Sequence, residues 1–202
     1  MKTRTLLIAG AAVAALSIGA CSQETGGAPD QQNQAANAVQ DHAAGVVGAG
    51  AAPVGAMTSA TFVSNAAIGG MYEVEAGRIA AQRSKTPAVK ALGERMVAEH
   101  TSAGEALKPV AAAANLAIPT ALDQRHQGLI DNLRGATDQD FDRVYLQQQE
   151  AAHNETAMLL ETYGRMGDND GLKRWAAATL VVVKDHQRAV DGLDEANADR
   201  PH

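Results

Sequence analysis

The chain has 202 residues, a formal net charge of −6, one cysteine and only 3% aromatic residues. An acidic chain without a basic patch is a poor binder of nucleic acid and of anionic lipid surfaces, because neither attracts it electrostatically. The single cysteine excludes an internal disulfide framework.

Residues 1–20 have the pattern of a signal peptide. Lys2 and Arg4 precede an uncharged apolar run that is too short to remain as a membrane-spanning helix. The run ends at Cys21, and the four residues IGAC at 18–21 resemble a bacterial lipobox. This resemblance implies cleavage before Cys21 and lipidation of that residue, which would anchor the protein without a spanning helix. The alternative is an ordinary secretory signal with an incidental cysteine.

Cleavage would also change the charge and the location of the protein. It removes the two positive charges of Lys2 and Arg4, so the net charge falls from −6 to −8. The lipid, and not electrostatic attraction, would then hold the protein at a membrane. Ser22, where an Asp would retain a lipoprotein in the inner membrane, indicates the periplasmic face of the outer membrane in a Gram-negative cell.

Residues 21–56 are expected to be the lipidated cysteine and a flexible tether. This segment is rich in Gln, Ala, Gly and Asn and contains no aromatic residue. Such a composition cannot bury enough apolar surface to offset the entropy cost of ordering. A folded domain is expected at 57–197, with a short C-terminal tail at 198–202.

The domain has apolar residues at helical spacing throughout, with abundant alanine and few turn signals. The first long helix is expected over about residues 58–83. Pro87 suits the first turn of a second long helix, and Pro109 should bend that helix because it removes a backbone donor. A shorter helix containing Leu129 and Leu133 follows.

Two further long helices complete the domain, over about residues 138–163 and about 172–197. Thr137 or Asp138 is the expected N-cap of the first of these. Four helices of about 25 residues with mostly short connections predict an all-α, up-down four-helix bundle, with a short extra helix between the second and third long helices.

Three histidines fall on or near the helix faces that should point to the core. His100, His153 and His186 each have apolar residues three, four or seven positions away. Glu73 in the first helix has only Gly or Ala at these distances, so the adjacent helix should bury its carboxylate, which would then need a partner.

These four residues lie near the middle of their helices and would share one layer of an antiparallel bundle. Three imidazoles and a carboxylate suit zinc, copper or iron, so the layer is a candidate transition-metal site. Glu75 and Glu150 are second choices for the carboxylate. Two alternatives stay open: a metal-free polar network, in which Glu99, Asp185 or Glu150 would partner the histidines, and an error in the helix boundaries.

A di-iron carboxylate site is not favoured. Such a site needs Glu-x-x-His on two helices, and only Glu150 with His153 provides it, because Val97 and Val183 precede the other two histidines. No nucleophilic triad, phosphate loop or dinucleotide fingerprint is found. No catalytic residue is therefore predicted, and the balance leans away from an enzyme.

Three segments of the domain resemble the bacterial domain of unknown function 4142 family, whose members are often labelled outer membrane proteins. They begin FVSNAAIGGMYEVEAG, FDRVYLQQQEAAHNET and LKRWAAATLVVVKDHQ, and the resemblance covers about residues 62–193. It implies a ferritin-like four-helix bundle in the cell envelope, with recurring positions at Glu73, His100, Tyr145, His153 and His186. Pro109 departs from the family pattern. No reaction is implied, because the activity of the family is not established.

The sequence thus predicts a lipid-anchored envelope protein whose helical bundle binds a transition metal through Glu73, His100, His153 and His186. The alternative is a non-enzymatic envelope interaction or stress-response module whose buried His/Glu network is purely structural. The membrane is the one partner that the sequence indicates, through Cys21.

Overall fold

A computed structural model describes residues 57–198. The expected signal peptide, the lipidation site at Cys21, the tether up to residue 56 and the tail beyond residue 198 lie outside the described residues.

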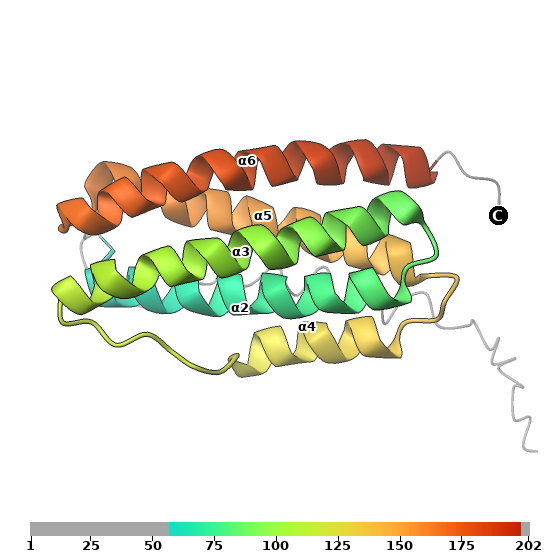
Figure 1. Ribbon diagram of the computed structural model, residues 1–202, viewed down its shortest axis with the longest axis horizontal. Coiled ribbons are helices and arrows are strands. Elements are labelled where there is room, and N and C mark those ends of the chain that lie inside the picture. The colour runs from blue at the N-terminus through green and yellow to red at the C-terminus, as the bar shows by residue number, and fades with distance from the viewer. Residues whose placement is uncertain (1–56, 199–202) are drawn as a thin grey trace, which may run out of the picture.

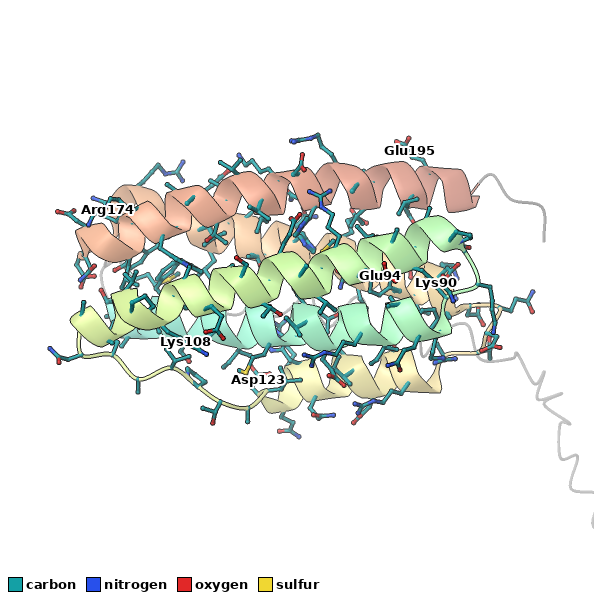
Figure 2. All side chains as sticks on the ribbon, viewed as in Figure 1. Lys90, Glu94, Lys108, Asp123, Arg174 and Glu195 are labelled. Carbon is teal, nitrogen blue, oxygen red and sulfur yellow. The ribbon has the colours of Figure 1, made fainter. Side chains whose placement is uncertain are left out.

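The described part of the chain is all-helical, which confirms the predicted all-α bundle (Figure 1). The long helices are α2 (Ser59–Arg83), α3 (Pro87–Ala113), α5 (Phe141–Met166) and α6 (Asp170–Ala198), and the short helix is α4 (Gln124–Gly135). These bounds lie within a few residues of the expected ones. Charged side chains such as those of Arg174 and Glu195 extend from the outer faces of the bundle (Figure 2).

Local capping explains where the helices begin. The Thr58 hydroxyl accepts a hydrogen bond from the Thr61 backbone N–H and caps α2. The N-cap of α5 is Asp140, not the expected Thr137 or Asp138. The Thr137 hydroxyl instead accepts from the Asp140 backbone N–H, so this part of the chain forms a turn before the helix starts.

The four long helices form a ring in which α2 packs along α3, α3 along α6, α6 along α5 and α5 along α2. The ends of the helices fix their directions. Ser59 Oγ lies 2.6 Å from the Tyr163 hydroxyl, so the start of α2 meets the end of α5. Arg83 Nη1 donates to the Leu133 carbonyl oxygen at 2.7 Å, so the end of α2 meets the end of α4. Neighbouring long helices are therefore antiparallel.

The four long helices do not simply alternate in direction along the chain, because α4 intervenes between α3 and α5. This helix carries the chain back along α2, so α5 starts at the same end of the bundle as α3 and runs in the same direction (Figure 1). The order is up-down-down-up, and one longer crossover between the second and third long helices is the connection found in ferritin-like bundles. The expectation of a shared mid-helix layer is unaffected, because neighbouring helices remain antiparallel.

The core consists of two apolar clusters at opposite ends of the bundle. The α4-end cluster contains buried residues from the second half of α2 and the first half of α3, among others: Tyr72, Ile79, Leu92, Met96, Ile130, Leu133, Phe141, Leu146 and Val190. The Phe62-end cluster lies at the other end: Phe62, Val63, Leu107, Ala157, Leu160, Tyr163, Leu172, Ala176 and Val183. Four buried polar residues near the middle of the long helices belong to neither apolar cluster. We call them the histidine layer: Glu73, His100, His153 and His186.

Small residues allow α2 and α3 to approach closely. A Cβ atom on Gly77 would lie 2.7 Å from the carbonyl oxygen of Gly93, and a Cβ atom on Gly93 would lie 2.7 Å from that of Gly77. Glycine is therefore required sterically at this crossing. Among residues 57–198, no helix has the length and apolar character needed to cross a membrane.

Candidate metal centre

The histidine layer takes one residue from each long helix: Glu73 from α2, His100 from α3, His153 from α5 and His186 from α6. All four are buried, with relative exposures of 1%, 7%, 0% and 0%. The three imidazole rings pack around one another, with centroid separations between 5.1 and 5.5 Å. The structure thus brings together the three histidines that the helical spacing singled out.

The hydrogen-bonding state of His153 follows from its helix. Its Nδ1 lies 2.8 Å from the carbonyl oxygen of Gln149, one turn earlier in α5. A carbonyl oxygen only accepts hydrogen bonds, so Nδ1 carries the proton. In the neutral ring, Nε2 is then left with a lone pair directed into the layer.

His186 is oriented by a carboxylate on the neighbouring helix. Its Nε2 lies 2.6 Å from Oε2 of Glu99 in α3. Arg95 Nε donates to the other oxygen of Glu99 at 3.1 Å. Partial burial raises the pKa of Glu99, but the hydrogen bonds from Arg95 and His186 outweigh it and hold that pKa below its usual value. Glu99 is therefore ionised at neutral pH and accepts the Nε2 proton of His186, which leaves a lone pair on Nδ1.

The two free lone pairs face each other. His153 Nε2 and His186 Nδ1 are 3.2 Å apart. Two neutral imidazoles in these tautomers would repel at this separation, so the pair needs a cation or a shared proton between the nitrogens. The distance is close to the ~3.3 Å between two ligands of a tetrahedral ion with metal–nitrogen bonds of about 2.0–2.1 Å.

Burial disfavours a shared proton between the two rings, because it lowers the pKa values of the histidines. Desolvation lowers the pKa of His153 to about 4. It also lowers the pKa of His186, although the hydrogen bond to Glu99 opposes the shift, and it lowers that of His100 well below its usual value. The three rings are therefore neutral near pH 7, which is the state in which imidazole binds metals.

His100 completes the group. Its Nε2 is buried and has no hydrogen-bond partner. The potential ligand atoms of His100, His153 and His186 all lie within 4.8 Å of one another, and this histidine cluster could hold a metal ion. The edge of a loaded tetrahedral site is ~3.3 Å, which the pair His153 and His186 already matches at 3.2 Å.

Glu73 lies in the layer but behind His153. Its Oε1 is 3.7 Å from Nδ1 of His153. This nitrogen donates a hydrogen bond to the Gln149 carbonyl oxygen and faces away from His186. Both oxygens of Glu73 are buried and accept no hydrogen bond, and the Tyr145 hydroxyl and the Gln149 side-chain amide are also unpartnered. Burial raises the pKa of Glu73 to about 8, with the Gln149 amide opposing the shift. Glu73 is therefore a neutral acid near pH 7, and its oxygens are not among the converging ligand atoms.

The two second-choice carboxylates lie elsewhere. Glu75 forms ion pairs with Arg134 at 2.8 Å and Arg78 at 3.6 Å. Glu150 is exposed on the outside of α5. Of the carboxylates proposed as histidine partners, Glu99 is the one that contacts a histidine of the layer. The role of the Gln149 carbonyl was missed, although its position four residues before His153 is a signal that could have identified it.

Comparison with known proteins places the domain in a family. No curated protein and no solved structure shows significant similarity to the chain. The family model described as "Domain of unknown function (DUF4142)" matches residues 44–193, which is most of the chain and includes all five described helices up to Leu193. The chain therefore belongs to the DUF4142 family, as its resemblance to that family predicted.

Proposed function

We propose that the helical domain binds one transition-metal ion through His100, His153 and His186. The observation that carries this proposal is the 3.2 Å separation between His153 Nε2 and His186 Nδ1, two nitrogens whose other ring positions are engaged by Gln149 and Glu99. Metal-bound histidines commonly donate their second N–H to a carbonyl or a carboxylate, which fixes the tautomer and the orientation of the ring. His153 and His186 have one partner of each kind.

The donor set indicates the class of metal. Three neutral imidazoles without a thiolate suit Zn²⁺, Cu²⁺ or Fe²⁺, and Cu²⁺ has the highest intrinsic affinity of these divalent ions. Three protein ligands leave a tetrahedral ion with one position for water or another small ligand. The site therefore supports the binding of one metal ion with an open coordination position, and no catalytic step is assigned.

The proposal includes a location at the cell envelope. It rests on the signal-like residues 1–20, the IGAC sequence ending at Cys21 and the Ser22 that follows it. A lipid on Cys21 would hold this acidic domain at the periplasmic face of the outer membrane. Replacing residues 1–21 by a signal peptide that is cleaved without lipidation should move the protein from the membrane fraction to the soluble fraction, and unchanged membrane association would contradict the anchor.

Calorimetric titration of the full-length protein with Zn²⁺ and Cu²⁺ tests the metal site. We expect one ion per chain and, at a free metal concentration of 100 times Kd, about 2.7 kcal/mol of added stability. For a chain of this size that corresponds to a rise in Tm of roughly 5–10 °C. Alanine replacement of His100, His153 or His186 should lower the affinity by more than the ~10–100-fold typical of losing an outer-shell partner.

His126 provides the matched control. It is a largely buried histidine outside the layer, and its Nδ1 lies 2.7 Å from Oδ1 of Asp123. His126→Ala should leave metal binding unchanged. The alternative function, an interaction module with a purely structural His/Glu network, is favoured by the 2.6 Å contact between His186 and Glu99. That alternative predicts no metal-dependent stabilisation, and this result would overturn the metal proposal.

A further inference from the structure

A cavity of about 650 Å³ lies beside the histidine cluster, and residues of all five described helices and of the connection that joins α3 to α4 line it. Its walls include Gly70, Met71, His100, Gly104, Ile118 and Trp175. His100 belongs both to the cavity wall and to the histidine cluster. The function proposed above makes no use of this space.

The cavity exists because α4 covers only part of α2. The His126 ring at the start of α4 lies 5.5 Å from the Tyr72 ring, and the end of α4 is bonded to Arg83, so α4 faces the second half of α2. The extended connection alone crosses the first half, as Figure 1 shows. Side chains do not fill the space there, since Cβ atoms on Gly70 and Gly104 would meet no atom within 4 Å.

The walls select for an uncharged, mainly apolar molecule. Most of the lining surface is apolar, and four threonines, Thr101, Thr120, Thr156 and Thr179, are among the uncharged polar residues that line it. Each charged side chain at the cavity contacts one of opposite charge. Glu75 contacts both Arg134 at 2.8 Å and Arg78 at 3.6 Å, and Lys108, labelled in Figure 2, donates to Glu105 at 2.6 Å.

We infer that this cavity binds a neutral single-chain amphiphile, such as a fatty alcohol, with its chain against the apolar wall and its head group among the threonine hydroxyls. Pockets for small molecules have volumes of about 300–1,000 Å³ and apolar walls with a few placed polar groups, and this cavity fits that description. The inference goes beyond the proposed function and does not require a bound metal.

Trp175 provides the readout. It is the only tryptophan of the chain and it lines the cavity, so its fluorescence should report occupancy directly. We expect saturable changes in emission when the metal-free, full-length protein is titrated with 1-alkanols from butanol to octanol. The affinity should rise about fourfold per added CH₂, because burying one such group contributes about 0.8 kcal/mol. Octyltrimethylammonium should bind more weakly than octanol, because the cationic side chains Arg78, Lys108 and Arg134 outnumber the anionic Glu75 and Glu105 at the cavity.

Filling the cavity tests its location. Gly70→Leu and Gly104→Leu place a side chain in open space and replace a poor helix former by a good one, so both variants should remain folded. Each should weaken octanol binding at least tenfold. Gly192→Leu is the matched control, because Gly192 is a helical glycine with equally open surroundings and does not line the cavity.

Two results would overturn the inference. One is the absence of a saturable change in Trp175 emission with octanol. The other is equal octanol affinity in wild type, Gly70→Leu, Gly104→Leu and Gly192→Leu, which would place any binding outside the cavity. Neither result depends on metal binding, so failure of this inference is distinguishable from failure of the metal proposal.

Discussion

The two apolar clusters and the histidine layer between them are built from the same four helices, yet they differ in how well their side chains are satisfied. In the clusters, residues such as Leu146 and Leu160 are almost completely buried among other apolar groups. In the layer, Glu73 and His100 bury polar atoms without partners, as does Gln149 beside it. The clusters account for the stability of the bundle, whereas the layer reduces it.

The contrast bears on function because an unpaired buried polar group costs about 1–3 kcal/mol. An apolar layer of the same volume would hold the helices together at least as well. The nitrogens of His153 and His186 face each other, and the opposite nitrogen of each ring is held by Gln149 or Glu99. Under the proposed function this arrangement prepares a site for an ion, whereas the apolar clusters stabilise the fold.

The largest effect is expected from the α4-end cluster. Leu146→Ala should reduce the free energy of unfolding by about 2–5 kcal/mol, because it removes buried methyl groups and leaves a cavity. Urea denaturation of the metal-free protein measures this loss. A cost below about 1 kcal/mol would mean that Leu146 lies in a site that collapses easily, and would weaken the contrast with the layer.

A change of the opposite sign is expected in the layer. The pKa of Glu73 is about 8 in the folded protein against 4.5 for an ordinary glutamate, so the folded state favours the protonated acid. Between pH 4.5 and pH 8 the unfolded chain ionises first, so this one group lowers stability by up to about 1.4 kcal/mol per pH unit. Below pH 6.5 the histidines of the layer act in the opposite direction, because burial lowers the pKa values of His100, His153 and His186 in the folded state. The contribution of Glu73 is therefore measured against a variant that keeps these histidines.

Glu73→Gln removes this ionisation and keeps the shape of the side chain. The metal-free variant should be more stable than wild type at pH 8, and the two should converge near pH 4.5. Chemical denaturation at several pH values provides the comparison. If wild type loses no more stability than the variant as the pH rises, Glu73 is not the buried acid described above.

The sequence predicts the helices and their buried faces better than it predicts the geometry of the site. Apolar spacing placed His100, His153 and His186 on inward faces, because a helix of 3.6 residues per turn repeats its buried face regularly. The same spacing could not show that Glu73 faces the rear of His153, since that depends on the rotation of α2 against α5. The tautomer of His153 depends on the Gln149 carbonyl, which helical spacing could have identified. The tautomer of His186 depends on Glu99 from another helix, and spacing alone could not choose it over Asp185 or Glu150.

A smaller effect is expected at the outer partner of His186. Glu99→Gln should weaken metal binding by about 10–100-fold, because the ring loses the carboxylate that orients it and raises its basicity. Calorimetric titration with Zn²⁺ measures the change. Asp185→Asn is the control: Asp185 binds Arg95 and does not contact the histidine cluster. Equal losses in both variants would point to a general electrostatic effect.

The smallest effect concerns two glycines of α2. Gly70→Ala should stabilise the protein by about 0.5–1 kcal/mol, because its Cβ enters open space and alanine favours the helix. Gly77→Ala should instead destabilise it, since that Cβ would lie 2.7 Å from a backbone oxygen of α3. Thermal unfolding of both variants gives the comparison, and effects of the same sign would contradict the described crossing of α2 and α3.

The central claim, that a metal ion binds between His153 and His186, is tested most directly by ¹⁵N NMR of the imidazole nitrogens during a Zn²⁺ titration at pH 7. Metal binding predicts that, before addition, Nε2 of His153 and Nδ1 of His186 are unprotonated, and that both shift to values typical of metal-bound nitrogen at one equivalent. A doubly protonated His186 whose nitrogens do not respond to Zn²⁺ would contradict the claim and identify the layer as a structural hydrogen-bonded network.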